Sequence, residues 1–278
     1  MSDRDFLARM AAESRARAAS ALPRAELIAR AVEVPAPRTI SMNAFGLIAE
    51  VKLASPSEGR IAPASDDETR VLKQAATYAD AGASAISVLT EPSAFGGSLD
   101  HLHAASGAVE TPTMRKDFLV DPIQLLEARV HGASGALLIA RMLDGVALAR
   151  MLDDAASLGL FILLECFDEH DCARSSAALD GRGASPEILV GVNTRDLSTL
   201  EVRDDRLASL VDLLPPDRRR VAESGLRTAD DARRAASLGY DLALVGTALM
   251  RAGDPRELAC AMLAAGELGA SERSGARR

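Results

Sequence analysis

The chain repeats one pattern of polar and apolar positions along most of its length. A segment that predicts a helix is followed by a glycine and then by a short aliphatic run. The runs show little alternation between apolar and polar residues, which is typical of parallel strands covered on both faces. Four instances of the pattern are YADAGASAISVLT, ARVHGASGALLIA, AASLGLFILLE and AASLGYDLALVG.

The pattern predicts a barrel. Glycines stand where a helix C-cap needs a left-handed backbone, at Gly82, Gly132, Gly159 and Gly239. Four further runs, LIAEVK, TPTMRK, EILVGVN and RRVAES, bring the predicted strands to eight. Eight strands that alternate with helices over about 230 residues indicate an α/β fold, the (β/α)8 TIM barrel. An open doubly wound sheet is the second choice, because no predicted strand is followed by a GxGxxG turn.

The barrel is expected to carry a segment at each end. Residues 1–45 predict an N-terminal helical extension of one or two helices, too small for an independent domain. Residues 46–268 are the predicted barrel, and residues 269–278 are expected to be a disordered tail. Because the flanks of a barrel are occupied by its own helices, we expect the extension to cover the barrel mouth. The alternative is that it plugs the bottom as a brace.

Composition narrows the class of protein. The chain has 278 residues, of which 48% are hydrophobic, enough for a sizeable core. A net charge of −8 argues against a nucleic-acid or anionic membrane surface. Three cysteines without a CxxC pair favour a reducing compartment. Because a signal-peptide core and a long apolar run are also missing, we expect a cytoplasmic monomer with no nucleic-acid or membrane partner.

Lysine is rare in this chain. Lys52, Lys73 and Lys116 are its three lysines, so 29 of the 32 Lys and Arg residues are arginines. Lys52 and Lys116 end the first and third predicted strands, the edge at which TIM barrels place functional side chains. Arginine can supply a permanent cation but cannot release a proton near neutral pH, as a general acid must. The two strand-end lysines are therefore candidate proton donors, whereas Lys73 is an ordinary helix residue.

Acidic and amide residues end several other predicted strands. Glu50 lies two residues before Lys52, so both side chains share one strand face. A single charge at a strand end is more often a surface residue or part of a structural ion pair. A whole set at one end of a barrel is hard to explain in this way, because unpaired buried charge is costly. The set comprises Glu50, Lys52, Lys116, Glu165, Asn193, Arg195 and Glu223.

The seventh and eighth predicted strands end in glycine–hydroxyl pairs. These pairs are Ser224–Gly225 and Gly246–Thr247. Barrel phosphate sites lie after these two strands, where glycines let backbone amides approach an anion. Glycines that only make tight turns are the simpler alternative. Two such pairs in adjacent loops favour a phosphate site.

Other candidate motifs carry less chemistry. His101 and His103 form an HxH sequence, but no third metal ligand of matching spacing is evident. Phe95, in the loop sequence FGGS, is a possible aromatic contact for a substrate. We therefore expect no metal and no nicotinamide, flavin or other cofactor.

Seven stretches in order resemble the indole-3-glycerol-phosphate synthase family of tryptophan biosynthesis. They are AEVKLASPSEG, SVLTEPSAFGGS, MRKDFLVDP, LLECFD, GVNTRDL, VAESGLRT and LVGTALMR. The resemblance runs from about Arg38 to Leu258 and includes the helical extension. It implies a carbon–carbon lyase (carboxy-lyase) acting on a phosphosugar-anthranilate, in the pathway to tryptophan or a tryptophan-derived metabolite. The reaction would close the indole ring of 1-(o-carboxyphenylamino)-1-deoxyribulose 5-phosphate with loss of carbon dioxide and water, without a cofactor.

The resemblance also implies a role for each site residue. Lys116 would be the general acid that protonates the ketone oxygen. Glu165 would act as a base or stabilise positive charge on the anilino nitrogen, and Lys52 would assist the later dehydration, with Glu50 positioning the lysines. The remaining roles are the anthranilate end for Asn193, Arg195 and Phe95, and the phosphate for Ser55, Ser224, Gly225, Gly246 and Thr247, with Glu223 supporting that wall.

Three residues depart from the family pattern. Leu53, Glu58 and Ala94 stand where the family usually has a cation, a lysine or glycine, and a second aromatic residue. These changes bear on substrate affinity more than on the chemistry. Two other functions stay open, a related phosphosugar barrel enzyme such as phosphoribosylanthranilate isomerase and a non-catalytic phosphosugar-binding paralogue. The isomerase would not explain both lysines, and the paralogue would not need every ionisable residue.

Overall fold

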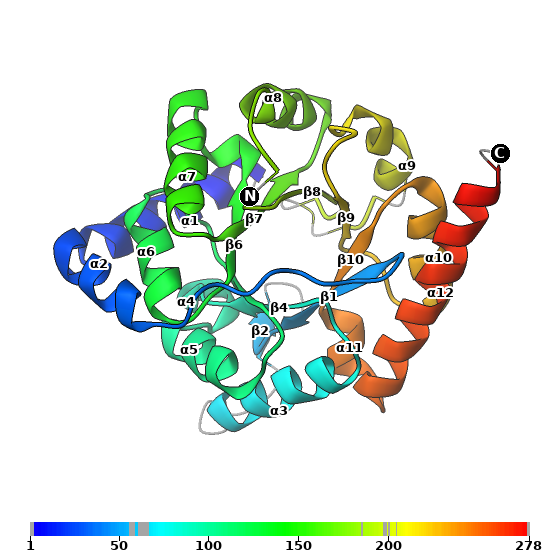
Figure 1. Ribbon diagram of the computed structural model, residues 1–278, viewed down its shortest axis with the longest axis horizontal. Coiled ribbons are helices and arrows are strands. Elements are labelled where there is room, and N and C mark those ends of the chain that lie inside the picture. Colours follow the sequence, from blue (N-terminus) through cyan, green and yellow to red (C-terminus); the bar gives the residue numbers. More distant parts are fainter. Residues whose placement is uncertain are drawn as a thin grey trace.

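The computed structural model describes residues 3–55, 59–60, 67–184, 186–196, 199, 201–203 and 205–276. Within these residues, eight parallel strands close into a barrel in the order β1-β10-β9-β8-β7-β6-β5-β4 (Figure 1). The strands are β1 (Gly46–Val51), β4 (Ala85–Leu89), β5 (Thr113–Lys116), β6 (Gly135–Ile139), β7 (Phe161–Cys166), β8 (Ile188–Asn193), β9 (Arg220–Glu223) and β10 (Leu242–Val245). The predicted (β/α)8 barrel is confirmed.

Helices surround the barrel and join its strands. The longer ones are α3 (Asp67–Asp80), α5 (Leu99–Ala108), α6 (Ile123–Val130), α7 (Gly145–Ser157), α8 (Glu169–Leu179), α10 (Ala229–Leu238) and α12 (Pro255–Ala276). Shorter elements are α4 (Pro92–Phe95), η2 (Ala140–Met142), α9 (Arg206–Leu210), η3 (Val211–Leu213) and α11 (Thr247–Arg251). A small antiparallel pair, β2 (Ala54–Ser55) and β3 (Gly59–Arg60), follows β1.

Local sequence signals set the ends of the helices. Thr228 Oγ1 accepts a hydrogen bond from the backbone N–H of Asp231 (3.2 Å), and Asp231 Oδ2 accepts one from the N–H of Thr228 (2.9 Å). These reciprocal bonds form a capping box at the start of α10. Gly239 ends the same helix with a φ of +121°, a backbone conformation that residues with a side chain rarely adopt.

The barrel interior changes from apolar to ionisable toward the carboxyl ends of the strands. On β1, buried Ile48 precedes Glu50 by two residues, and on β7 buried Leu163 precedes Glu165 by two. Because side chains two apart in a strand point to the same face, each row begins in the apolar core and ends in a charge. This alternation places the predicted site residues at one end of the barrel.

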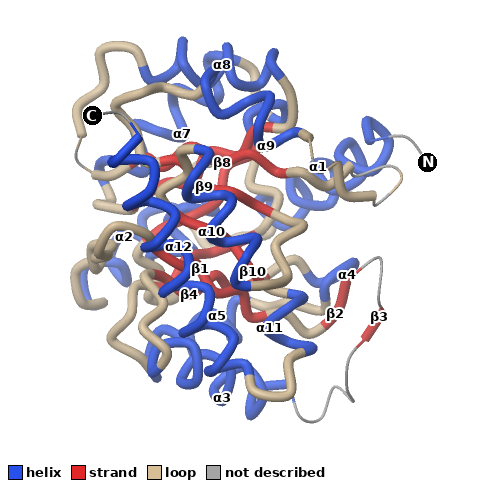
Figure 2. Tube along the Cα trace, turned by 90° about the vertical axis from the view of Figure 1, so that its right-hand side faces the viewer, coloured by secondary structure: helices blue, strands red, loops and turns tan. Residues whose placement is uncertain are grey.

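The N-terminal extension contacts both ends of the barrel. Helix α1 (Asp3–Ala19) lies beside the carboxyl ends, where Arg17 pairs with Asp117 directly after β5 (2.6 Å). Helix α2 (Arg24–Glu33) packs against α6. Segment 34–45, drawn in blue, then crosses the opposite end in Figure 1, where the backbone N–H of Arg38 donates to Ser134 Oγ (3.0 Å) ahead of β6. Figure 2 shows α1 and α4 on the same side of the barrel. The first helix thus lies at the mouth, as expected, and the connecting segment lies across the bottom.

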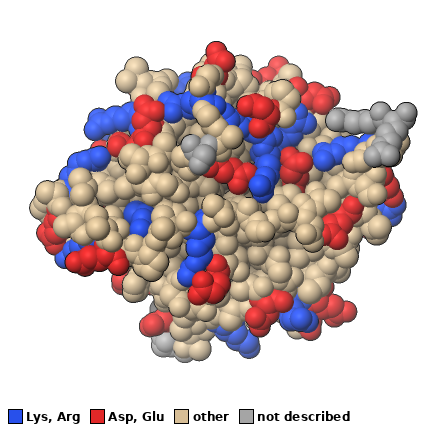
Figure 3. Space-filling model, in the orientation of Figure 1, with Lys and Arg blue, Asp and Glu red and all other residues tan. Residues whose placement is uncertain are grey.

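The surface carries charges of both signs. In the space-filling view of Figure 3, basic and acidic side chains are interspersed on the face crossed by segment 34–45. None of the helices in the described part of the chain combines the length and the apolar character needed to span a lipid bilayer.

The expectation of a disordered tail from residue 269 is wrong for residues 269–276, which continue helix α12. Packing on α10 explains the difference. Ala270 is buried, and Arg233 on α10 forms an ion pair with Glu272. Arg273 Nη2 also lies 3.4 Å from Asp241 Oδ1. The low hydrophobicity of the tail sequence hides this helix, because much of its attachment is ionic and small-residue packing.

Two glycines in α12 provide a test of that packing. A Cβ at Gly269 would overlap the backbone carbonyl oxygen of Arg233, whereas a Cβ at Gly275 would meet nothing within 4 Å. We expect Gly269→Ala to lower the free energy of unfolding by about 1–3 kcal/mol, because the two helices must separate. Gly275→Ala should raise it by about 0.5–1 kcal/mol, because alanine favours the helix. Urea denaturation measures both, and two neutral variants would contradict an ordered helical tail.

Candidate active site

The carboxyl ends of the strands surround a cavity of about 810 Å³. Nearly every site residue expected from the sequence lines it, on β1, β5, β7, β8 and β9, on α4, and in the segments that follow β1, β8, β9 and β10. These residues are Glu50, Lys52, Phe95, Lys116, Glu165, Asn193, Arg195, Glu223, Ser224, Gly225, Gly246 and Thr247. The side chain of Ser55 and the whole of Glu58 lie outside the described part of the chain. Leu53 is buried in the apolar layer between the strands and the helices.

Two lysines and two carboxylates form the charged centre of the cavity. Lys116 Nζ lies 3.8 Å from Glu165 Oε2 and 4.0 Å from Glu50 Oε2. The other oxygen of Glu50 lies 3.5 Å from Lys52 Nζ. Lys52 also donates a hydrogen bond to Thr247 Oγ1 (2.8 Å). Glu50 therefore connects both lysines, and Lys52 connects this centre to the loop after β10.

The ammonium of Lys116 is stabilised by its neighbours. Burial by itself would lower the pKa of Lys116, because the charged form loses hydration. The negative charges of Glu165, Glu50 and Glu223 outweigh burial, and the pKa of Lys116 lies above its ordinary value. Lys116 is therefore protonated at neutral pH.

Glu223 is the most unusual carboxyl group of the site. Its side chain is 1% exposed, and within the described residues neither of its oxygens accepts a hydrogen bond. Burial and the nearby Glu165 carboxylate raise the pKa of Glu223 well above the usual carboxyl range. One oxygen of Glu165, Oε2, also lacks a hydrogen-bond donor among these residues. The two side chains can meet hydroxyl or amino groups of a ligand in the cavity.

Two glycines make room for these carboxylates. A Cβ at Gly191 on β8 would overlap Glu223 Oε1, and a Cβ at Gly246 would overlap Glu50 Oε1. Gly246 was expected from the sequence only as a phosphate-loop residue, and Gly191 was not expected at all. A glycine inside a strand can mark a close approach of this kind, but the sequence does not say what approaches.

The loop after β9 holds a strained backbone. Ser224 has a φ of +65° and Gly225 a φ of +77°. A left-handed residue with a side chain costs about 1–3 kcal/mol and persists where the surroundings require it. A Cβ at Gly225 would lie 2.7 Å from Val202 Cγ1, so glycine also lets the neighbouring loop pack closely. Both residues line the cavity, as an anion-binding turn requires.

Aromatic residues form another wall. The Phe118 ring lies 6.2 Å from that of Phe95 on α4 and 5.8 Å from that of Phe6 on α1, measured between centroids. All three line the cavity. Sequence reasoning found Phe95 alone, although Phe118 directly follows the Lys116–Asp117 pair. Phe6 belongs to the predicted N-terminal helical extension, and only the fold shows that it reaches the cavity.

Cationic residues near the glycine loops, the segments that contain Ser224–Gly225 and Gly246–Thr247, were also missed by sequence reasoning. Arg227 and Arg251 line the cavity shortly after Gly225 and Thr247 in sequence. Each lies inside a quoted motif, VAESGLRT or LVGTALMR, so the signal was an arginine two to four residues beyond a candidate phosphate-binding glycine or threonine. His103, one of the two discounted histidines, lies with its ring 6.3 Å from that of His131.

A family model for indole-3-glycerol phosphate synthase matches residues 14–262 of the chain. The chain belongs to the indole-3-glycerol phosphate synthase family. A member of that name from Mycobacterium ulcerans (strain Agy99) is 44% identical over 245 residues, covering 87% of this chain and 86% of that protein. Another from Mycobacterium avium (strain 104) is 46% identical over 222 residues, covering 80% and 78%. The family resemblance seen in the sequence is confirmed.

Solved structures of other proteins share the fold. 3-Hexulose-6-phosphate synthase from Salmonella typhimurium superposes with a TM-score of 0.61 at 15% identity, covering 81% of this chain and 100% of that chain. Thiamine phosphate pyrophosphorylase from Pyrococcus furiosus gives 0.57 at 15% identity, covering 82% and 98%. At 15% identity this likeness shows the barrel fold alone. It says nothing about the roles of the residues that line the cavity.

The raised pKa of Glu223 predicts a pH-dependent contribution to stability. Its folded-state pKa lies above that of an exposed carboxyl, so the folded protein keeps a proton that the unfolded chain has released. Stability from this group is present below the unfolded pKa of about 4.3 and is lost as pH rises toward the folded pKa. In E223Q this loss is absent, so its melting temperature relative to the parent should rise between about pH 5 and about pH 8. The exposed Glu33→Gln is the control, and the same pH response in both variants would contradict the prediction.

Proposed function

We propose that the chain closes the indole ring of 1-(o-carboxyphenylamino)-1-deoxyribulose 5-phosphate as a carboxy-lyase, in the biosynthesis of tryptophan or a compound derived from it. The observation that supports this most is the contact of Lys116 with Glu165 and Glu50 in one cavity. A chain with three lysines and 29 arginines keeps an amine at the place where this reaction needs an acid. Family membership agrees with this reaction and disfavours the isomerase alternative.

The cavity offers a suitable surface for each part of this substrate. The aromatic wall of Phe6, Phe95 and Phe118 fits the aryl ring. The charged centre fits the ketone and hydroxyl groups of the sugar, and the glycine loops fit the phosphate. Asn193 Oδ1 accepts a hydrogen bond from the backbone N–H of Arg195 (2.9 Å). This bond fixes the amide, and we assign its NH2 group and Arg195, which both lie at the cavity, to the anthranilate carboxylate.

Ring closure would use Lys116 as the acid. The aryl carbon that bears the carboxylate attacks the ketone carbon, and the ketone oxygen takes a proton from the Lys116 ammonium as the new C–C bond forms. Positive charge then develops on the anilino nitrogen, where the Glu165 carboxylate can stabilise it. Loss of carbon dioxide returns the bonding electrons to the ring and restores its aromaticity.

Dehydration would complete the indole. The new hydroxyl leaves as water with a proton from Lys52, while a base removes the proton from the adjacent carbon. Glu165 is the proposed base, and Glu50 holds both ammonium groups in place. Side chains supply every acid and base in this scheme, so the proposal requires no cofactor. A monomeric state and a cytoplasmic location stay predictions.

Replacement of Lys116 by arginine tests the acid role. The guanidinium keeps the charge but holds its proton, so kcat should fall by about 10²–10⁴-fold with the fold intact. Fluorescence of the indole product measures turnover, and circular dichroism checks folding. Lys73→Arg, in exposed helix sequence, is the matched control and should keep its activity. More than half the parental activity in K116R would remove Lys116 from this role.

Inorganic phosphate tests the glycine loops. It should inhibit competitively and raise the melting temperature, since a ligand at about 100 times its Kd adds roughly 2.7 kcal/mol. Ala248 lines the cavity directly after Thr247. Ala248→Asp should therefore abolish the protection by charge repulsion, whereas the near-isosteric Ala248→Asn should retain more of it. Equal protection of both variants would place the phosphate elsewhere.

A further inference from the structure

Helix α1 presents one continuous face to the barrel mouth. Phe6, Met10, Glu13, Ser14 and Arg17 share this face, because residues three, four, seven and eleven apart return to the same side of a helix. The N-terminal half of the face is apolar, with Phe6 against Phe118 and Met10 buried. The other half is polar, which is unusual for a surface that is covered by the barrel.

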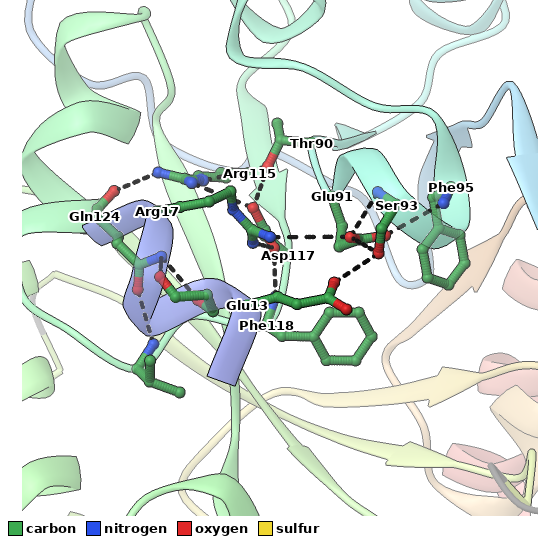
Figure 4. A network of polar contacts seen from close by, with 12 residues as sticks. Glu13, Arg17, Thr90, Glu91, Ser93, Phe95, Arg115, Asp117, Phe118 and Gln124 are labelled. Carbon is green, nitrogen blue, oxygen red and sulfur yellow. Dashed lines mark hydrogen bonds and ion pairs between the residues drawn. The ribbon is translucent and has the colours of Figure 1, made fainter. Parts of the chain in front are cut away.

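The polar half is hydrogen-bonded to α4, to α6 and to the loop after β5, as Figure 4 shows for Glu13 and Arg17. Glu13 Oε2 accepts from Ser93 Oγ (2.7 Å), and Ser14 Oγ accepts from Gln124 Nε2 (2.8 Å). Arg17 Nη2 donates to Asp117 Oδ1 (2.6 Å). The helix is therefore held in one place by directional bonds and not by apolar contact alone.

Asp117 directly follows Lys116 and has a fully buried carboxylate. Besides Arg17, it accepts hydrogen bonds from the backbone N–H of Phe118 (2.8 Å), Thr90 Oγ1 (2.9 Å) and Arg115 Nη2 (3.2 Å). The backbone N–H of Thr90 donates in turn to the carbonyl oxygen of Lys116 (3.0 Å). The backbone around Lys116 is thus held from both sides, and Asp117 is the centre of that arrangement.

A second buried carboxylate faces Arg17. Glu91, after β4, accepts hydrogen bonds from the backbone N–H groups of Ser93, Ala94 and Phe95, which fixes helix α4 and its aromatic ring. Its side chain has no exposed surface, and Oε1 lies 3.8 Å from Arg17 Nη1. One guanidinium from the N-terminal helix therefore reaches two carboxylates, one beside Lys116 and one that caps the helix of Phe95 (Figure 4).

Removal of Arg17 would leave these carboxylates poorly compensated. Arg115, the other cation of this described network, also pairs with Glu127 (3.1 Å). Without Arg17, Arg115 would be the remaining cation of this network for both Asp117 and Glu127. Glu91 would still accept hydrogen bonds from backbone N–H groups but would lose its ion-pair partner. A buried carboxylate that loses its partner is strongly destabilised, so its loop would shift toward water or toward another donor.

We propose that Arg17 is a positioning residue: by bridging Asp117 and Glu91, it aligns Lys116 and Phe95 for the substrate. This inference rests on the proposed function for its effect on turnover. Arg17 touches no reacting atom and acts through the loops after β4 and β5. The extension therefore contributes to catalysis through one charge as well as by covering the mouth.

The test compares Arg17→Met with Arg15→Met. Methionine keeps the length and helix propensity of arginine but removes the charge. Arg15 is exposed on the same helix and serves as the matched control. Below its melting transition, R17M should lose at least about tenfold in kcat/KM, with part of the loss in kcat, whereas R15M should match the parent. R17K, which keeps the charge with fewer donors, should lie between R17M and the parent.

Two further measurements separate positioning from stability. In the Asp117→Asn background the R17M substitution should have a smaller effect on kcat, because the charge it leaves unpaired is gone. In the ligand-free protein, hydrogen exchange at the amides of Phe118 and of Ser93–Phe95 should be faster in R17M than in R15M. Loss of thermal stability with unchanged kcat and KM would overturn the proposal, as would unchanged exchange at these amides. If the parent itself forms no indole product, the proposed function fails, and the exchange result still decides whether Arg17 holds these loops.

Discussion

The Lys116 ammonium is held in a largely buried barrel mouth by the carboxylates around it, and much of the site follows from this constraint. An isolated buried ammonium would either lose its proton or move out toward water. Glu165 and Glu50 therefore have to lie within ion-pair distance of Lys116. Those carboxylates need room in turn, which Gly191 and Gly246 provide for Glu223 and Glu50. A strand that begins in the apolar core can end in a buried charged side chain only when neighbouring residues supply an opposite charge and leave room for that side chain.

The same burial and charges shift the pKa values of two ionisable residues of the site, Glu223 and Lys116. Burial and the neighbouring Glu165 carboxylate drive the pKa of Glu223 far above the usual carboxyl range. Neither of its oxygens has a hydrogen-bond donor among the described residues, so both can still accept one from a ligand in the cavity. The negative charges around Lys116 raise its pKa despite burial, so Lys116 keeps its proton at neutral pH. The acid of the proposed reaction is thus prepared before a substrate arrives.

The features that follow from strand periodicity and composition were predicted from the sequence. The features that depend on which residues come close together in the folded chain were missed. The strands, the strand-end charges and the glycine loops follow from local patterns, and Lys116 stood out because lysine is rare. Gly191 could not be recognised, because its role is to leave space for a side chain from another strand. The order of residues 269–276 was missed because ion pairs and a glycine contact with α10 attach them, without an apolar stripe.

Helix α1 shows why charge, and not apolar area, suits the mouth of this barrel. Apolar contacts tolerate small displacements, whereas a guanidinium shared by two buried carboxylates fixes both distance and direction. Arg17 lies eleven residues from Phe6 on the same helix, about 16 Å along its axis. Because a helix transmits position rigidly over this length, the bond of Arg17 to Asp117 also places Phe6 against Phe118. One hydrogen-bond network, centred on Arg17 and Asp117, therefore positions both the Lys116 ammonium and the aromatic wall. In the proposed function, this network aligns the amine with the aryl ring of the substrate.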